Sequence, residues 1–232
     1  MIKSVIVFVV LWVSMPMILS ARKPSDVHIK KVEVGKNENY AIKNVDSSLV
    51  VEIDTLVMSD KASLEFVGVK KANLMVKHAR IGKNCVIKGD DGKNNGTNLI
   101  FCVNIESLGG LLINVPGLDA KMSNRKVRNG DGGDVEIRYL LSGMKPQFEN
   151  KKQAGYVEIK NNGGGYLTTP QSDLYSVFSL MRSGSPGRPL GLLTNGMVYS
   201  GNVGKNGRTQ FLGVEKLVAI PDSKASSVRP SH

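Results

Sequence analysis

The sequence predicts an all-β protein, either a solenoid of the β-helix kind or a sandwich, with glycine-rich turns and one short helix. From residue 27 to residue 76, short segments rich in branched apolar residues recur about every ten residues, and no segment with helical periodicity lies between them. Glycine becomes dense in the middle of the chain, where it permits tight turns and close approach of backbones. The glycines keep no strict period of three, which excludes a collagen triple helix.

The first expected strand covers residues 27–34, where apolar and charged side chains alternate. Short segments of the same kind follow, separated by Asp, Asn, Ser, Lys or Gly. They comprise residues 40–42, 49–53, 55–58, 63–67, 73–76, 111–115, 135–139, 156–160, 197–199, 211–212 and 217–220.

Two patterns indicate a repeated architecture. Residues 79–89 resemble one coil of a solenoid, with a glycine turn between two short apolar strands. Residues 135–138 and 157–160 share the pattern apolar-Glu-Ile-basic, 22 positions apart, which suggests an internal repeat. In both segments we expect Val and Ile to face inward and the charged residues to face outward.

The one expected helix covers residues 172–182. Its apolar residues are spaced as on one helical face, and they are Leu174, Val177, Phe178 and Met181. Ser172 or Asp173 would cap its start, and Arg182 with Gly184 would suit its end.

The chain begins with the features of a secretory signal. A cationic start at Lys3 precedes an apolar run, and the small residues Ser20 and Ala21 offer a cleavage point. A transmembrane anchor is the alternative, and Ser14 and Pro16 interrupt the run that it would need. We therefore expect a signal peptide at 1–21, a β-rich domain at 22–221 with a sub-boundary near 166–190, and a loose tail at 222–232.

The net positive charge of the chain favours anionic binding partners. The formal net charge is +11, and +10 once Lys3 is removed with the signal. Such a balance favours acidic glycans or anionic headgroups, or simply solubility. A nucleic-acid surface is not expected, because the basic residues are spread out and aromatic residues are sparse, with Trp12 lost in the signal. After cleavage no apolar run is long enough to span a membrane.

The two cysteines, Cys85 and Cys102, lie 17 residues apart. In an oxidising compartment an even count is compatible with a disulfide, which would stabilise the fold by roughly 3 kcal/mol. Both cysteines also stand in apolar contexts, so two buried thiols are an equal alternative.

No catalytic, cofactor-binding or metal-binding set emerges from the sequence. His28 and His78 are expected to be exposed strand residues, and no nucleophile elbow is present. Glu136 and Glu158 occupy equivalent positions in the two similar segments, so they could stack as a glycosidase pair or join a ladder of opposite charges. The ladder is the favoured interpretation.

The acidic and glycine-containing loops are interpreted as turns. Asp90-Asp91-Gly92 and the segment 131–134 could bind calcium, but Asp residues that bond their own backbone explain them better. The segment 204–209 lacks the order of a P-loop and is predicted to form a hairpin turn centred on Asn206-Gly207.

Three stretches carry a resemblance to a known family, namely residues 79–84, 90–93 and 129–135. They resemble the exported glycine-rich, collagen-like-repeat β-proteins of Bacteroidetes-type bacteria, over roughly residues 50–165. The resemblance implies service as a periplasmic or surface accessory of outer-membrane machinery, such as the plug subunit of the type 9 secretion translocon, or as an adhesive surface protein. The glycine runs of this chain are short, as in 91–96, so a true polyglycine layer is not expected.

The expected function is that of a non-enzymatic, exported structural or interaction protein of the bacterial envelope, either periplasmic or at the cell surface. Its partner would be an envelope or outer-membrane protein complex, or an anionic surface polymer. The alternatives are a lectin-like adhesin and, less favoured, a carbohydrate-active enzyme on a β-helix.

Overall fold

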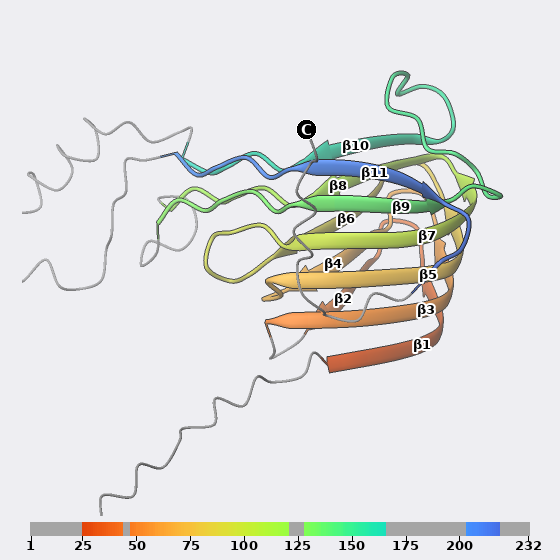
Figure 1. Cartoon of the computed structure of the whole chain (residues 1–232), viewed down its shortest axis with the longest axis horizontal. Helices are drawn as coiled ribbons and strands as arrows, with labels where there is room; N and C mark the ends of the chain where they lie inside the picture. Colours follow the sequence, from red (N-terminus) through yellow and green to blue (C-terminus); the bar gives the residue numbers. More distant parts are fainter. Residues whose placement is uncertain (1–24, 44–46, 121–127, 166–202, 219–232) are drawn as a thin grey trace, which may run out of the picture.

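The computed structural model describes residues 25–43, 47–120, 128–165 and 203–218 (Figure 1). Five expectations lie outside the described residues, namely the signal peptide at 1–21, the sub-boundary near 166–190, the helix at 172–182, the strand at 197–199 and the tail at 222–232.

The described chain forms a parallel β-solenoid, which confirms the all-β prediction and selects the solenoid over the sandwich. Successive strands alternate between two sheets, so each coil contributes one strand to each (Figure 1). The six-stranded sheet contains, in spatial order, β1 (Ser25–Val34), β3 (Ser48–Met58), β5 (Lys71–Ile81), β7 (Asn98–Leu108), β9 (Val135–Leu140) and β11 (Thr209–Val214). The five-stranded sheet contains β2 (Asn39–Lys43), β4 (Ser63–Val67), β6 (Cys85–Asp90), β8 (Gly110–Asn114) and β10 (Tyr156–Lys160).

The length of a coil is regular at first and then grows. Val27 lies beside Val51, and Val51 lies beside Leu74, so the first coils repeat after 24 and 23 residues. Leu99 then lies beside Val135, because residues 115–134 extend the connection between β8 and β9. The longest connection, residues 161–208, separates β10 from β11.

Apolar side chains from both sheets fill the interior of the solenoid. In register, Val51, Leu74, Phe101 and Ile137 form one buried row across the six-stranded sheet. Alternation explains the row, because every second residue of a strand faces the same side. Each such side chain contributes roughly 1.5–3 kcal/mol by leaving water, so stacked rows of this kind hold the coils together.

The turns between the two sheets are stacked as well. Asn37, Lys61 and Asn84 each follow a long strand and adopt the left-handed conformation, with φ values of 61°, 61° and 56°. The backbone N–H of Asn37 donates to Asp60 O, and that of Lys61 donates to Lys83 O. Each turn therefore forms a backbone hydrogen bond with the turn of the neighbouring coil. Asn adopts a positive φ more readily than most residues.

Two strand expectations and one turn expectation were wrong. Residues 49–53 and 55–58 belong to a single strand, β3, because Asp54 faces outward in the sheet instead of ending the strand. Leu217 and Val218 are not in a strand. Residues 204–208 form no hairpin; they run extended into β11, and the N–H of Gly207 donates to Asn161 O in a neighbouring segment.

Beyond the strands, a second kind of core replaces the apolar one. We call it the glycine layer, and it consists of five extended segments, residues 94–97, 115–118, 130–134, 161–164 and 203–207. They adjoin the strands as wavy ribbons in Figure 1. Their bonds pass directly between segments, as in Gly96 N to Asp131 O at 2.9 Å and Gly204 N to Gly164 O at 2.8 Å. The expectation that no polyglycine layer forms was therefore wrong.

Only glycine fits at the contacts of this layer. A Cβ on Gly130 would overlap the carbonyl group of Asn94 and come within 2.8 Å of Asn95 N. A Cβ on Gly117 would overlap the carbonyl of Gly130 in the same way. Short glycine runs suffice because each segment needs glycine only where another backbone crosses it, which is the steric rule that also governs collagen.

Candidate functional site

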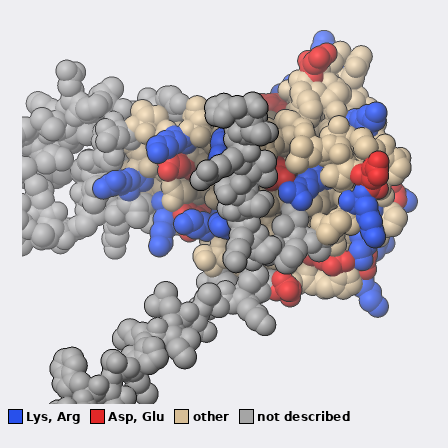
Figure 2. All heavy atoms as spheres, viewed as in Figure 1, with Lys and Arg blue, Asp and Glu red and all other residues tan. Residues whose placement is uncertain are grey.

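The outer face of the six-stranded sheet carries charged side chains in paired clusters. Figure 2 shows Lys and Arg interleaved with Asp and Glu over the described part of one face. Outward positions recur across neighbouring strands at the strand spacing of about 4.8 Å, which lets opposite charges meet.

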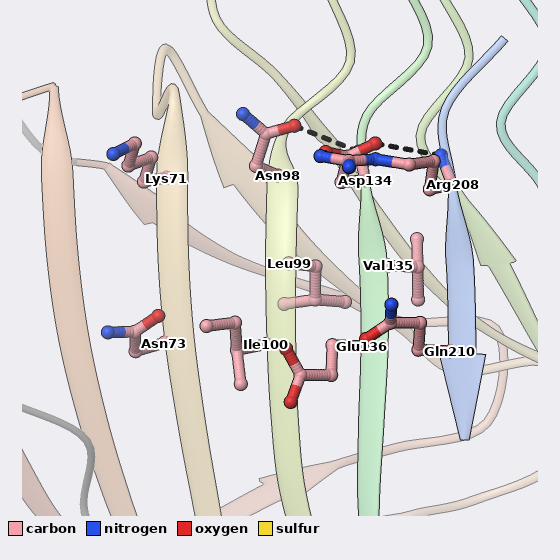
Figure 3. A pocket seen from close by; sticks show the side chains of 10 residues that line it. All are labelled: Lys71, Asn73, Asn98, Leu99, Ile100, Asp134, Val135, Glu136, Arg208 and Gln210. Atoms are coloured by element: carbon pink, nitrogen blue, oxygen red, sulfur yellow. Dashed lines mark hydrogen bonds and ion pairs between the residues drawn. The ribbon is translucent and has the colours of Figure 1, made fainter. Parts of the chain in front are cut away.

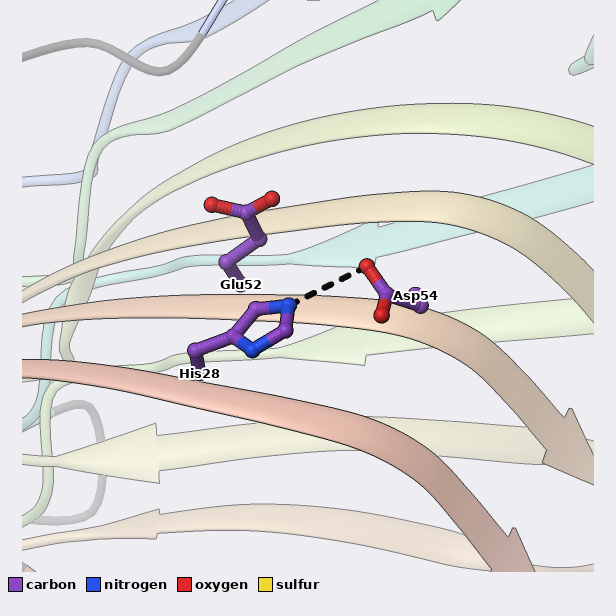
Figure 4. A group of neighbouring side chains, drawn as sticks. All are labelled: His28, Glu52 and Asp54. Atoms are coloured by element: carbon purple, nitrogen blue, oxygen red, sulfur yellow. Dashed lines mark hydrogen bonds and ion pairs between the residues drawn. The ribbon is translucent and has the colours of Figure 1, made fainter.

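One cluster contains the residue types of a metal site. His28 Nε2 lies 3.1 Å from Asp54 Oδ1, and a carboxylate oxygen of Glu52 lies within 4.8 Å of both (Figure 4). Lys77 Nζ, however, lies 2.7 Å from Glu52 Oε1 and 2.8 Å from Asp54 Oδ1. The hydrogen bonds from Lys77 and then His28 lower the pKa of Asp54, and the bonds to Asp54 and Glu52 raise the pKa of Lys77. The ammonium group thus occupies the position that a cation would need.

The second histidine lies in a cluster of the same design. His78 Nδ1 is 2.8 Å from Glu106 Oε1, and Arg80 Nε donates to Glu106 Oε2 at 2.7 Å. These hydrogen bonds, that of Arg80 first, lower the pKa of Glu106. Both histidines are exposed strand residues, as predicted, and each is held by a carboxylate rather than placed beside a nucleophile.

A shallow groove of about 340 Å³ lies on this face, where β5, β7, β9 and β11 begin (Figure 3). Two rows of polar side chains border it. The N–H of Asp134 donates to Asn98 Oδ1 at 2.8 Å, and Arg208 donates to both oxygens of Asp134 at 2.7 and 2.9 Å. These bonds from Arg208 lower the pKa of Asp134. The row therefore locks β11 onto β9.

A larger groove of about 690 Å³ lies on the outer face of the five-stranded sheet. Its walls carry four lysines and one glutamate, a net charge of +3, and these are Lys83, Lys151, Lys152, Lys160 and Glu158. We call it the basic groove. This groove could not be predicted from the sequence, because Lys151 and Lys152 belong to the connection 141–155 between β9 and β10, which reaches the sheet only in the folded chain.

The two glutamates that the sequence singled out do not form a catalytic pair. Glu136 lies on β9 in the six-stranded sheet, and Glu158 lies on β10 in the five-stranded sheet, so the two glutamates do not stack. The spacing of 22 resembled one coil, but the next strand of the same sheet lies much further along the chain. The favoured ladder of opposite charges between the two strands is wrong for the same reason. Each glutamate instead pairs with the basic residue two positions further along its own strand, Glu136 with Arg138 at 2.5 Å and Glu158 with Lys160 at 3.5 Å.

The cysteines are free thiols, and both are buried. Cys85 begins β6 in the five-stranded sheet, where its thiol lies 3.1 Å from Ser59 O. Cys102 lies on β7 beside Met75 and Arg138, and it points outward because its neighbours in the strand point into the core. The two side chains therefore point to different places and form no disulfide. The structure agrees with the alternative of two buried thiols. Burial raises the pKa of both thiols.

The first acidic loop follows the predicted turn chemistry, whereas the aspartates of 131–134 bond a distant backbone segment instead of their own. Asp90 Oδ1 accepts the N–H of Gly92 at 2.8 Å, and Asp91 Oδ1 accepts that of Lys93 at 2.7 Å. Asp131 Oδ1 accepts the N–H of Lys205 at 2.7 Å, three residues before Asp134 makes the equivalent bond. These carboxylates hold backbone segments together.

Within the described residues, no helix is long and apolar enough to cross a membrane. Neither the known family models, nor the curated proteins, nor the solved structures contain a match to this chain. The site must therefore be interpreted from its own geometry, which is that of a β-solenoid with ion-paired outer faces and one strongly basic groove.

Proposed function

We propose that this chain is a non-enzymatic, exported structural or interaction protein of the bacterial cell envelope. Its partner is an outer-membrane protein complex or an anionic surface polymer, and an accessory or plug of a translocon is one form of this role. The observation that carries the proposal is the state of the surface carboxylates: Glu52, Asp54, Glu106, Glu136 and Glu158 are all engaged by cations.

Ion-paired carboxylates are poor general acids and bases, because the cation lowers the carboxyl pKa and a neighbouring hydrogen bond fixes the oxygen. A solenoid surface of this kind is well suited to binding. Its side chains stand on rigid strands at a constant spacing, so they lose little entropy when they contact a partner.

The proposal is tested by affinity purification with the tagged protein from detergent-solubilised envelope at moderate salt. We expect a defined outer-membrane complex or an acidic polymer to be retained and then released as the salt rises, because exposed charge contacts are screened. The rival is a carbohydrate-active enzyme. Polysaccharide cleavage by the purified protein, abolished in Glu136→Gln or Glu158→Gln, would refute the non-enzymatic role.

A lectin-like adhesin is the second candidate, and the groove of Figure 3 favours it. Asn98 and Gln210 line that groove and carry side-chain amides, a type of group that commonly binds sugar hydroxyls. A glycan array separates this candidate from the first: binding of neutral sugars without turnover supports it, and no binding to any glycan excludes it.

A further inference from the structure

The floor of the basic groove is apolar and open. Val86 on β6 and Leu112 on β8 lie side by side in register on the outer face of the five-stranded sheet. Tyr156 begins β10 beside Gly110, and a Cβ at Gly110 would meet nothing closer than Asn84 N at 3.6 Å. Without a side chain at Gly110, the surface next to the tyrosine stays open to a flat ligand.

The walls of the groove are basic, and part of their charge is unused. Lys151 Nζ lies 3.0 Å from Glu158 Oε2, and Lys160 Nζ lies 3.5 Å from Glu158 Oε1. In the described part of the chain, the ammonium groups of Lys83 and Lys152 have no ion-pair partner. The groove therefore presents two unpaired cations and two cations that share one carboxylate.

The connection that carries Lys151 and Lys152 is fixed in place rather than loosely attached. Gln147 Oε1 accepts the N–H groups of Glu149 and Asn150, and the N–H of Gly155 donates to Leu108 O at 2.6 Å. A pre-ordered wall reduces the entropy that binding costs.

The combination of groups identifies the ligand chemistry. The lysines attract carboxylates, while the apolar floor and the ring of Tyr156 suit the C–H face of a sugar. Glu158 lies between two lysines, where it can accept a sugar hydroxyl but repels closely spaced phosphates. The groove has one aromatic residue, whereas single-stranded nucleic acid requires several for successive stacking.

We propose that the basic groove binds a chain of carboxylated sugars, an acidic polysaccharide. This inference rests on the proposed function and deepens it, because it assigns the anionic-polymer partner to a specific surface. The ligand lies across β6, β8 and β10, with its carboxylates toward the lysines and its sugar faces on the apolar floor.

The test measures equilibrium binding of fluorescently labelled polygalacturonate to the full-length protein at low and moderate salt. We expect the Lys151→Gln/Lys152→Gln double variant to bind about tenfold more weakly, because two exposed charge contacts contribute a factor of a few each. The matched control is Lys36→Gln/Lys70→Gln, which removes the same charge from exposed positions outside the groove and should bind as the wild type does. Circular dichroism confirms that both variants are folded.

Neutral dextran and inorganic polyphosphate serve as comparison ligands. Weak binding of dextran and polyphosphate together with strong binding of polygalacturonate supports the proposal. Equal binding of polyphosphate, or an equal loss in the two double variants, overturns it. If this test fails while an envelope complex is still recovered by affinity purification, the proposed function stands but the basic groove is not its binding site. If the binding assay and the affinity purification both fail, the groove proposal and the proposed function are both rejected.

Discussion

Gly130 offers the strictest test of the glycine layer. The substitution Gly130→Ala adds one methyl group at a buried position where the carbonyl of Asn94 already fills the space. The clash is with backbone, so no side-chain rotation relieves it, and residue 130 must move away from Asn94. This movement breaks the bonds that residue 130 itself makes, from Gly130 N to Leu118 O at 2.9 Å and from Gly164 N to Gly130 O at 2.8 Å.

The expected loss follows from those two bonds. Each buried backbone group left without a partner costs about 1–3 kcal/mol, so Gly130→Ala should lower the free energy of unfolding by about 3–5 kcal/mol. A typical domain has a total free energy of unfolding of about 5–15 kcal/mol, so this single methyl group should remove a large part of the stability.

Urea unfolding followed by far-ultraviolet circular dichroism measures the effect. The matched control is Gly110→Ala in β8, where a Cβ meets nothing closer than 3.6 Å and the backbone φ is not positive. We expect the control to change the free energy of unfolding by less than about 1 kcal/mol. If both variants unfold at the wild-type urea concentration, the close packing of the glycine layer does not stabilise the protein and the reasoning is refuted.

Three further predictions concern the apolar core, the thiols and the end of the solenoid. Phe101→Ala should cost about 3–5 kcal/mol in the same urea assay, because it empties a fully buried site; a loss below about 1 kcal/mol would contradict the packing of the inward rows. Cys85 and Cys102 should resist alkylation in the folded protein and both react in denaturant without a reductant, as read by mass spectrometry, whereas resistance in denaturant would indicate a bridge. Arg208 lowers the pKa of Asp134 below its ordinary value of 3.8. The ion pair therefore contributes fully to stability at pH values above 3.8, and this contribution is lost as the pH falls through the lowered pKa. Acid should therefore destabilise the wild type more than Asp134→Asn in parallel urea titrations, and equal acid sensitivity would show that the pair contributes nothing.

Much of the fold could be predicted from local patterns, because strands in a solenoid alternate within a few residues. Residues 63–67 were predicted with the bounds that β4 has. The prediction missed that β3 is continuous, since Asp54 resembles a strand terminator until a partner strand supplies Lys77. The repeat of Gly35-Lys36-Asn37 in Gly82-Lys83-Asn84 marks two corners of the solenoid, and the spacing of 47 residues between them spans two coils.

The sites were harder to predict than the strands, because sequence spacing does not say which sheet a strand joins. Glu136 and Glu158 looked equivalent, yet they lie on different sheets. The basic groove combines residues from β6, β8, β10 and the connection 141–155, and none of these segments is distinctive alone. The glycine layer was missed because its glycines are spaced by contacts between segments rather than by a repeat within one segment.

The last strand has a consequence for how the molecule assembles and comes apart. Thr209 pairs with Val135, 74 residues earlier, whereas β3 pairs with β1 across 24. Closing the longer loop costs about 1 kcal/mol more, so β11 has the largest closure cost among the described strand pairs. Its departure uncovers the N–H and C=O groups of β9 along one edge. The solenoid therefore ends in a strand that can be exchanged for another chain at less cost than any interior strand.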